Sequence, residues 1–167
     1  MNNLRVGVDV GSTTIKIAVI DTKGTLLLHS YQRHFSDIAG TFAGILAYAR
    51  PFIEKAPFSI VFTGSAGIGL AEGLELPFVQ EVIACTSGIR RYLPKTGTAI
   101  ELGGEDAKIT YFYENMEQRM NGVCAGGTGS FIDHMATLLN TDAAGLNEMA
   151  KKASTVHPIA SRCGVFA

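Results

Sequence analysis

The sequence predicts an α/β protein that is built around a mixed β-sheet and begins a second, similar lobe. Two observations lead to this prediction. Apolar segments of strand length alternate with segments whose apolar residues recur at helical spacing. In addition, a unit of strand, glycine-rich turn and strand occurs twice, at Asp9 and again at Glu101, which indicates a weak internal repeat. We therefore expect a first lobe at residues 1–95 and the beginning of a second lobe at residues 96–167.

The composition argues against several classes of partner. The 167 residues are 47% hydrophobic and 17% charged, which is enough to bury a core. A formal net charge of -1 gives no reason to expect nucleic acid or an anionic membrane as a partner. No run reaches the roughly 18 apolar residues of a membrane span, so we expect no membrane association. The three cysteines are few and odd in number, which favours a reducing cytoplasm over a disulfide framework.

Three strands open the first lobe. We expect them at residues 5–9, 15–21 and 25–33. Residues 21–24 have the chemistry of a tight hairpin turn between the last two strands. Ser36 can cap a helix whose apolar residues recur through Ala49, and Pro51 is expected to end or bend that helix.

Strands and helices go on alternating after this helix. Residues 59–63 form a buried strand that leads into a glycine-rich loop at 64–69, and residues 79–93 form a helix that Pro94 stops. In the second lobe we expect strands at 98–102, 108–113 and 117–120, and helices at 131–139 and from 140–142 through Ala150. The chain stops on an apolar strand at 164–167. Because a strand needs partners for its backbone groups, we expect the sequence to be part of a longer protein.

The first glycine-rich turn has the chemistry of a phosphate site. Gly11, Ser12 and Thr13 leave backbone N–H groups pointing outward, and with two hydroxyls they make a concavity suited to phosphate oxygens. Lys16 adds a positive charge on the following strand, and Asp9 at the strand end can hold a metal-bound water. The alternative is an ordinary β-hairpin turn with a surface lysine, because short glycine motifs match often.

The second glycine-rich turn adds carboxylates. Gly103 and Gly104 again let the backbone approach a ligand, and three acids stand beside them: Glu101, Glu105 and Asp106. Carboxylates bind Mg²⁺ through water, and the metal binds the phosphate. Two such turns predict a clamp for a nucleotide triphosphate between two lobes, although an acidic surface turn is the alternative.

The cysteines give two interpretations. Cys124 opens a Gly/Ala/Thr run before a helix, where a thiolate is stabilised by the helix dipole, and Cys163 lies 39 residues further on. As residues alone, buried inert thiols are the favoured interpretation, and Cys85 fits it within an apolar helix. Two thiolates per chain fall short of a four-cysteine cluster, but two chains related by a two-fold axis supply four. The histidines have no partnered spacing and are interpreted as solvated or core residues: His29, His34, His134 and His157.

Four segments together resemble the ATP-dependent activators of 2-hydroxyacyl-CoA dehydratases, which are related to the ATPase subunits of benzoyl-CoA reductase. The resemblance covers nearly the whole chain in collinear order and rests on Asp9-Val-Gly-Ser-Thr-Thr-Ile-Lys16, Gly103-Gly-Glu-Asp-Ala-Lys108, Cys124-Ala-Gly-Gly-Thr-Gly129 and Ser161-Arg-Cys163. It implies the actin, sugar-kinase and heat-shock-protein ATPase fold, which is ribonuclease H-like. It also implies a homodimer in which ATP hydrolysis drives a low-potential electron into a dehydratase-type partner.

The resemblance also implies roles for particular residues. Cys124 and Cys163 of two subunits would together hold one 4Fe–4S cluster, while Asp9 and Glu101 would serve catalysis with Mg²⁺ and ATP. A ferredoxin or flavodoxin would be the electron donor. Glu101 departs from the family fold, which commonly has Asp there. The family also continues past the second cysteine, through the loop that binds adenosine.

Two other functions use the same fold. A sugar or small-acid kinase would need the nucleotide clamp but would have no use for Cys124 and Cys163. A non-catalytic, actin-like regulatory module would need neither. Iron and acid-labile sulfide in protein purified without oxygen would separate the activator from both alternatives.

Overall fold

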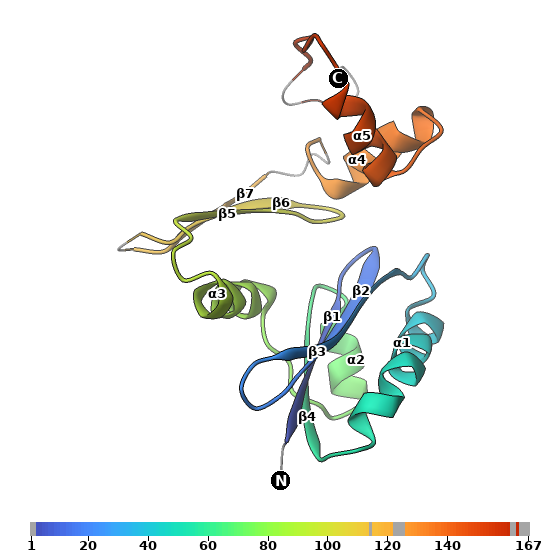
Figure 1. The fold of residues 1–167 in the computed structure, drawn as a ribbon, viewed down its shortest axis with the longest axis vertical. Helices are drawn as coiled ribbons and strands as arrows, with labels where there is room; N and C mark the ends of the chain where they lie inside the picture. Colours follow the sequence, from blue (N-terminus) through green and yellow to red (C-terminus); the bar gives the residue numbers. More distant parts are fainter. Residues whose placement is uncertain (1–2, 114, 122–125, 161–162, 164–167) are drawn as a thin grey trace. The chain divides into compact units, whose positions relative to one another are not determined.

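The computed structural model describes residues 3–113, 115–121, 126–160 and 163 (Figure 1). Contacts between residues divide the chain into two compact units, Met1–Pro94 and Lys95–Ala167. Each unit has its own sheet. Within the described part of the chain, no helix combines the length and the apolar character that crossing a membrane requires.

The first unit is organised by a four-stranded mixed sheet with the strand order β3-β2-β1-β4. Strand β1 (Leu4–Val10) pairs antiparallel with β2 (Thr14–Ile20) and parallel with β4 (Phe58–Thr63). Strand β3 (Leu26–Arg33) pairs antiparallel with β2. This arrangement confirms the predicted α/β class with a mixed sheet.

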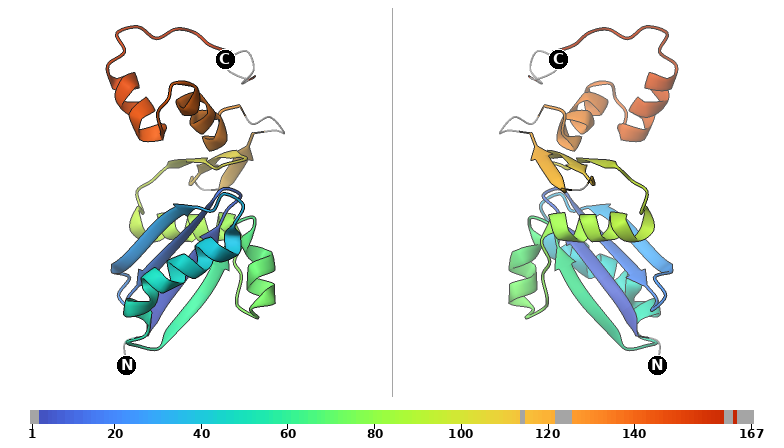
Figure 2. Two further views of the ribbon diagram at one scale, coloured as in Figure 1. Left: turned by 90° about the vertical axis from the view of Figure 1, so that its right-hand side faces the viewer. Right: turned by 90° about the vertical axis from the view of Figure 1, so that its left-hand side faces the viewer.

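Alternation along these strands sends the core residues to one face of the sheet. The buried residues on this face are Leu4, Val6, Val8, Val10, Ile15, Ile17, Val19 and Phe62. Helix α1 (Ile38–Ile53) packs on β2 and β3, and the short helix α2 (Gly67–Gly73) packs on β4 and β1 (Figure 2). Phe42 of α1 meets Phe62 edge to face, with ring centroids 5.6 Å apart.

The opposite face of the sheet carries small and polar residues and is spanned by helix α3 (Glu81–Tyr92). The helix is tied at both ends: the Val79 N–H donates to Phe62 O at 2.8 Å, and the Tyr92 hydroxyl donates to Gly24 O at 3.0 Å. A cavity of about 720 Å³ remains between α3 and the strands, with Asp9 and Lys16 in its lining.

The second unit contains a three-stranded antiparallel sheet in the order β5-β6-β7. Its strands are β5 (Thr98–Leu102), β6 (Ala107–Tyr111) and β7 (Glu117–Met120). Two short helices follow, α4 (Gly129–Leu138) and α5 (Ala143–Lys151). The antiparallel order of β5, β6 and β7 repeats that of β1, β2 and β3 in the first unit.

Helix α1 differs from its prediction at both ends. Its N-cap is Asp37, whose Oδ1 accepts from the Gly40 N–H at 2.9 Å, and Ser36 lies one residue too early, with a positive φ of 68°. Pro51 neither ends nor begins the helix but lies inside it, two residues before the last. Proline has no N–H to donate to the carbonyl of Ala47, four residues earlier, yet the helix continues for two residues beyond it.

Other predicted boundaries also change. The segment expected as a loop at 64–69 contains the start of α2, because Gly67 and Gly69 take helical conformations despite their low helix propensity. Gly64 alone has a positive φ there, 93°, and makes the turn after β4. Strand β6 ends at Tyr111, two residues before its predicted end. The apolar strand expected at 164–167 lies outside the described residues.

Candidate functional site

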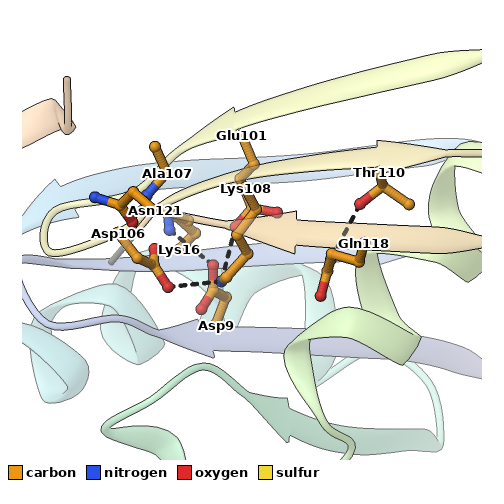
Figure 3. Close-up of polar contacts among 9 residues, drawn as sticks. All are labelled: Asp9, Lys16, Glu101, Asp106, Ala107, Lys108, Thr110, Gln118 and Asn121. Carbon is orange, nitrogen blue, oxygen red and sulfur yellow. Dashed lines mark hydrogen bonds and ion pairs between the residues drawn. The ribbon is translucent and has the colours of Figure 1, made fainter. Parts of the chain in front are cut away.

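The first glycine-rich turn is the short connection between β1 and β2. The Gly11 N–H donates to Thr14 O at 2.9 Å and closes it. In this register Asp9 lies opposite Lys16, and the Lys16 Nζ reaches the Asp9 Oδ2 at 2.7 Å (Figure 3). The hairpin therefore brings together the residues that the sequence selected.

This turn has hydrogen-bond donors that are available to bind an anion. No hydrogen bond to the N–H of Ser12 or Thr13 occurs within the described part of the chain. The Lys16 ammonium has three donors, of which Asp9 takes one, and both side chains remain about one third exposed. The ion pair is therefore weak enough, in contact with water, to rearrange around a phosphate oxygen.

Two residues at the end of β4 complete the surroundings of Asp9, and the sequence interpretation missed both. Thr63 is paired with Asp9 across the parallel strands, and its Oγ1 is buried without a hydrogen-bond partner among the described residues. A Cβ on Gly64 would lie 2.4 Å from both the Asp9 Oδ1 and Val10 O. The only sequence signal for this site was a glycine directly after a buried strand. That this glycine lies beside Asp9 of β1 depends on the fold and could not be read from the sequence.

The second glycine-rich turn connects β5 and β6. The Gly103 N–H donates to Asp106 O at 2.8 Å, and Glu101 lies opposite Lys108. Lys108 is buried, with 6% of its side chain exposed, and its Nζ lies 3.1 Å from the Asp106 Oδ2 and 3.5 Å from the Glu101 Oε1 (Figure 3). Both hairpins therefore place a lysine beside an acid on the neighbouring strand.

Lys108 changes the interpretation of the acids around this turn. Glu101 and Asp106 share one buried ammonium, whereas Glu105 is exposed. Within the described residues no group of three or more acidic, histidine or cysteine side chains is placed to hold a metal directly. The carboxylates of Glu101 and Asp106 are each about one third exposed. They can thus contact the water shell of a cation, which is how Mg²⁺ commonly binds proteins.

The second turn is also the docking point of helix α4. The Gly129 N–H donates to Gly103 O at 2.7 Å, and the Ser130 N–H approaches Gly104 O at 3.3 Å. Thr128 caps the helix, is fully buried, and accepts from the Phe131 N–H at 3.4 Å. The turn carbonyls therefore satisfy N–H groups that a helix N-terminus otherwise leaves unpaired.

Asn121 ties the segment that leads toward Cys124 to the same hairpin. Its Oδ1 accepts from the Ala107 N–H at 2.9 Å, while its own N–H donates to Ala107 O at 2.9 Å. This double contact had no signal in the sequence, because a single asparagine after a strand is common. It fixes the chain on the side of Cys124 that precedes the cysteine, as α4 does on the side that follows.

The two predicted cluster ligands differ in what the structure describes. Cys163 is a free, half-buried thiol. Cys124 lies outside the described residues, as do both chain neighbours of Cys163, Arg162 and Gly164. Cys85 is half-buried within α3 and forms no disulfide among the described residues.

Comparison with known protein families matches residues 6–167 to the BadF/BadG/BcrA/BcrD ATPase family. The (R)-2-hydroxyglutaryl-CoA dehydratase activating ATPase of Acidaminococcus fermentans is 26% identical over 170 residues, covering 100% of this chain and 65% of its own length. The 2-hydroxyisocaproyl-CoA dehydratase activator of Clostridioides difficile is 30% identical over 173 residues, covering 96% of this chain and 62% of its own length. The chain thus spans less than two thirds of these relatives.

Solved structures agree with this assignment. The crystal structure of the A. fermentans (R)-2-hydroxyglutaryl-CoA dehydratase component A superposes with a TM-score of 0.84 at 28% identity, covering 98% of this chain and 64% of that one. The activator of the 2-hydroxyisocaproyl-CoA dehydratase from Clostridium difficile, solved with bound ADPNP, has the same fold at a TM-score of 0.79 and 23% identity, covering 99% of this chain and 62% of that one. The actin-like ATPase fold that the sequence resemblance implied is thereby confirmed.

Proposed function

This chain belongs to the BadF/BadG/BcrA/BcrD ATPase family, and we propose that it serves in an ATP-hydrolysing iron–sulfur activator. The activator would drive a low-potential electron into a partner of the 2-hydroxyacyl-CoA dehydratase type. The named activities of the relatives support this proposal. A cytoplasmic homodimer that takes electrons from a ferredoxin or flavodoxin completes it.

The nucleotide phosphates would bind at the two glycine-rich turns, one in each proposed lobe. At the first turn, the free N–H groups of Ser12 and Thr13 and the Lys16 ammonium supply donors for phosphate oxygens. At the second turn, the Gly103–Gly104 backbone lets a phosphate approach closely. Phosphoryl transfer is catalysed mainly by positioning and charge, which are the properties these turns provide.

Acidic side chains would hold Mg²⁺ through its water shell. Asp9 and Glu101 stand at equivalent places in the two hairpins, each opposite a lysine, and each remains partly exposed. Asp106 and Glu105 lie at the second turn itself. When bound, Mg²⁺ neutralises phosphate charge. The lysines keep the carboxylates in place at partly exposed positions, where they can accept hydrogen bonds from coordinated waters.

Cys124 and Cys163 of two subunits would hold a 4Fe–4S cluster. The chemistry of the donors fits, because Cys163 is a free thiol and thiolates are the ligands that such clusters take. When bound, the cluster supplies one-electron chemistry at low potential. The protein's own part is to present the thiolates and to control their surroundings, since hydrogen bonds and exposure set the potential of such a centre.

The docking of α4 on the second turn is the observation that best supports a coupling between the nucleotide site and the cluster site. Gly129 and Ser130 donate to the carbonyls of Gly103 and Gly104, and Cys124 lies a few residues before this helix. A shift of the turn around a phosphate would therefore move the N-terminus of α4 and the cysteine segment with it. Nucleotide binding and cluster environment would change together.

Cysteine variants of the intact protein, as its own host makes it, test this proposal. On purification without oxygen, Cys124→Ala should lose its iron while still binding Mg-ATP, because the phosphate turns are untouched. Cys85→Ala is the matched control, since Cys85 in α3 is half-buried, as Cys163 is, and forms no disulfide among the described residues, and this variant should keep its iron. A Cys124→Ala protein with its full iron content would contradict the proposed cluster.

A further inference from the structure

His34 lies next to the first glycine-rich turn and contacts its backbone. It follows the last residue of β3 and is buried, with 6% of its surface exposed. Its ring Nε2 lies 3.2 Å from Gly11 O, and its ring Nδ1 lies 3.1 Å from the Ser36 N–H. Its backbone N–H donates to Thr13 O at 3.2 Å. The same residue thus contacts both ends of the turn between Gly11 and Thr13.

The partners of the ring fix the position of its proton. The Ser36 N–H can only donate, so Nδ1 must accept and carries no proton. The Gly11 carbonyl can only accept, so Nε2 carries the proton and donates it. The neutral ring therefore uses both nitrogens, one to hold its own backbone and one to hold the turn.

The bond to Gly11 also sets the direction of the Ser12 N–H. The Gly11 C=O and the Ser12 N–H belong to one planar trans peptide unit and point in opposite directions. When His34 draws the carbonyl toward itself, the Ser12 N–H points away from His34. That N–H has no hydrogen-bond partner within the described residues, as a donor kept for a ligand would.

The backbone after His34 is strained in a way that holds the ring in place. Phe35 and Ser36 have φ values of 45° and 68°, and the Asp37 N–H closes the turn on His34 O at 2.7 Å. Two central residues with positive φ favour Asn and Gly, and this chain has neither there. The Phe35 side chain is 85% exposed, so its burial does not compensate. In this conformation the Ser36 N–H donates to the His34 ring.

We propose that His34 is the positioning residue of the phosphate turn, which aims the Ser12 N–H at a phosphate oxygen of the bound nucleotide. The proposal rests on the function proposed above. It assigns to His34 no contact with the nucleotide and no proton transfer. His34 acts on binding by fixing one peptide unit before the ligand arrives, so that the bound state does not have to order it.

Two substitutions separate the two ring contacts. Asn at this position can accept from the Ser36 N–H, as Nδ1 does, but does not reach Gly11. Gln can place an amide donor near the position of Nε2 and keep the Gly11 bond. In the intact protein, His34→Asn should raise the Kd for Mg-ADPNP about fivefold to tenfold, the usual effect of losing one hydrogen bond. His34→Gln should stay within about twofold.

Further readouts distinguish positioning from a general loss of stability. Phe35→Gly should relieve the strained turn and raise the thermal midpoint without changing the Kd. The Ser12 amide resonance should move on addition of Mg-ADPNP in the wild type and move much less in His34→Asn. Wild-type affinity in His34→Asn, or equal losses in the Asn and Gln variants, would overturn the proposal. A wild type that binds no nucleotide would overturn the proposed function and this inference together.

Discussion

Gly64 lies where no larger residue fits beside Asp9. Its φ of 93° is in the left-handed region, and an added Cβ would lie 2.4 Å from the Asp9 Oδ1 and from Val10 O. The carboxylate could rotate away, but the Val10 carbonyl belongs to the backbone of β1 and has little freedom. A side chain here would therefore disturb the strand end that carries Asp9.

Gly64→Ala should consequently destabilise the fold by about 2 kcal/mol or more, through backbone strain and a close contact. It should also weaken Mg-ATP binding by displacing Asp9. The matched control is Gly44→Ala, because Gly44 is in α1 and has open space around it, so alanine there should stabilise by about 0.5–1 kcal/mol. Urea unfolding measures both variants. Equal urea midpoints for the two variants would show that a methyl group fits at position 64, which would contradict this prediction.

At the scale of elements, the contact between α4 and the second turn depends on Gly129. A Cβ at this position would lie 2.9 Å from Gly103 O, the acceptor of its own N–H bond. Alanine would favour the helix by about 1 kcal/mol but would push its N-terminus away from the turn. The two effects act on different properties, since one stabilises α4 and the other undocks it.

We therefore expect Gly129→Ala to keep α4 helical and to speed hydrogen exchange at the Ser130 amide, which loses its approach to Gly104 O. In the intact protein the variant should still bind iron and nucleotide. Nucleotide binding should, however, no longer change the properties of the cluster. Ser130→Ala is the control, because it leaves the backbone donor in place. Docking would not depend on Gly129 if Ser130 exchanged at the wild-type rate in the Gly129→Ala protein.

Elements with strong local patterns could be predicted from the sequence. The strands around both turns follow from apolar runs bounded by glycine, and a short hairpin fixes the register that sets Asp9 opposite Lys16. Helix α2 was missed because three of its seven residues are glycines, Gly67, Gly69 and Gly73. Propensity opposed the helix, and packing on β4 and β1 decided its conformation.

The residues that support the site could not be predicted in this way. His34 and Gly11 are 23 positions apart and meet because β3 returns beside β2, so the contact depends on tertiary structure. Asn121 and Ala107 are 14 positions apart, and their contact likewise depends on tertiary structure. The residues of the turns themselves were recognisable, because glycine, hydroxyl and lysine side chains at close spacing have a chemistry that is local.

At the scale of the whole molecule, two similar hairpins stand at the start of two units. Each holds a lysine against an acid, and the second also carries the helix that follows Cys124. The account requires both hairpins to act on one nucleotide and requires two copies of the chain to share one cluster. Its central claim is that ATP and a low-potential electron are handled by the same protein.

Purification of the intact protein without oxygen tests that claim most directly. The account predicts a brown protein with about four iron and four sulfide for every two chains, the content of one 4Fe–4S cluster. It further predicts that Mg-ATP changes the spectrum or the reduction potential of the reduced wild-type protein. The Cys124→Ala variant should show no iron–sulfur spectrum, with or without Mg-ATP. A colourless protein that binds and hydrolyses ATP with no iron would contradict the account and favour a kinase or another ATPase of this fold.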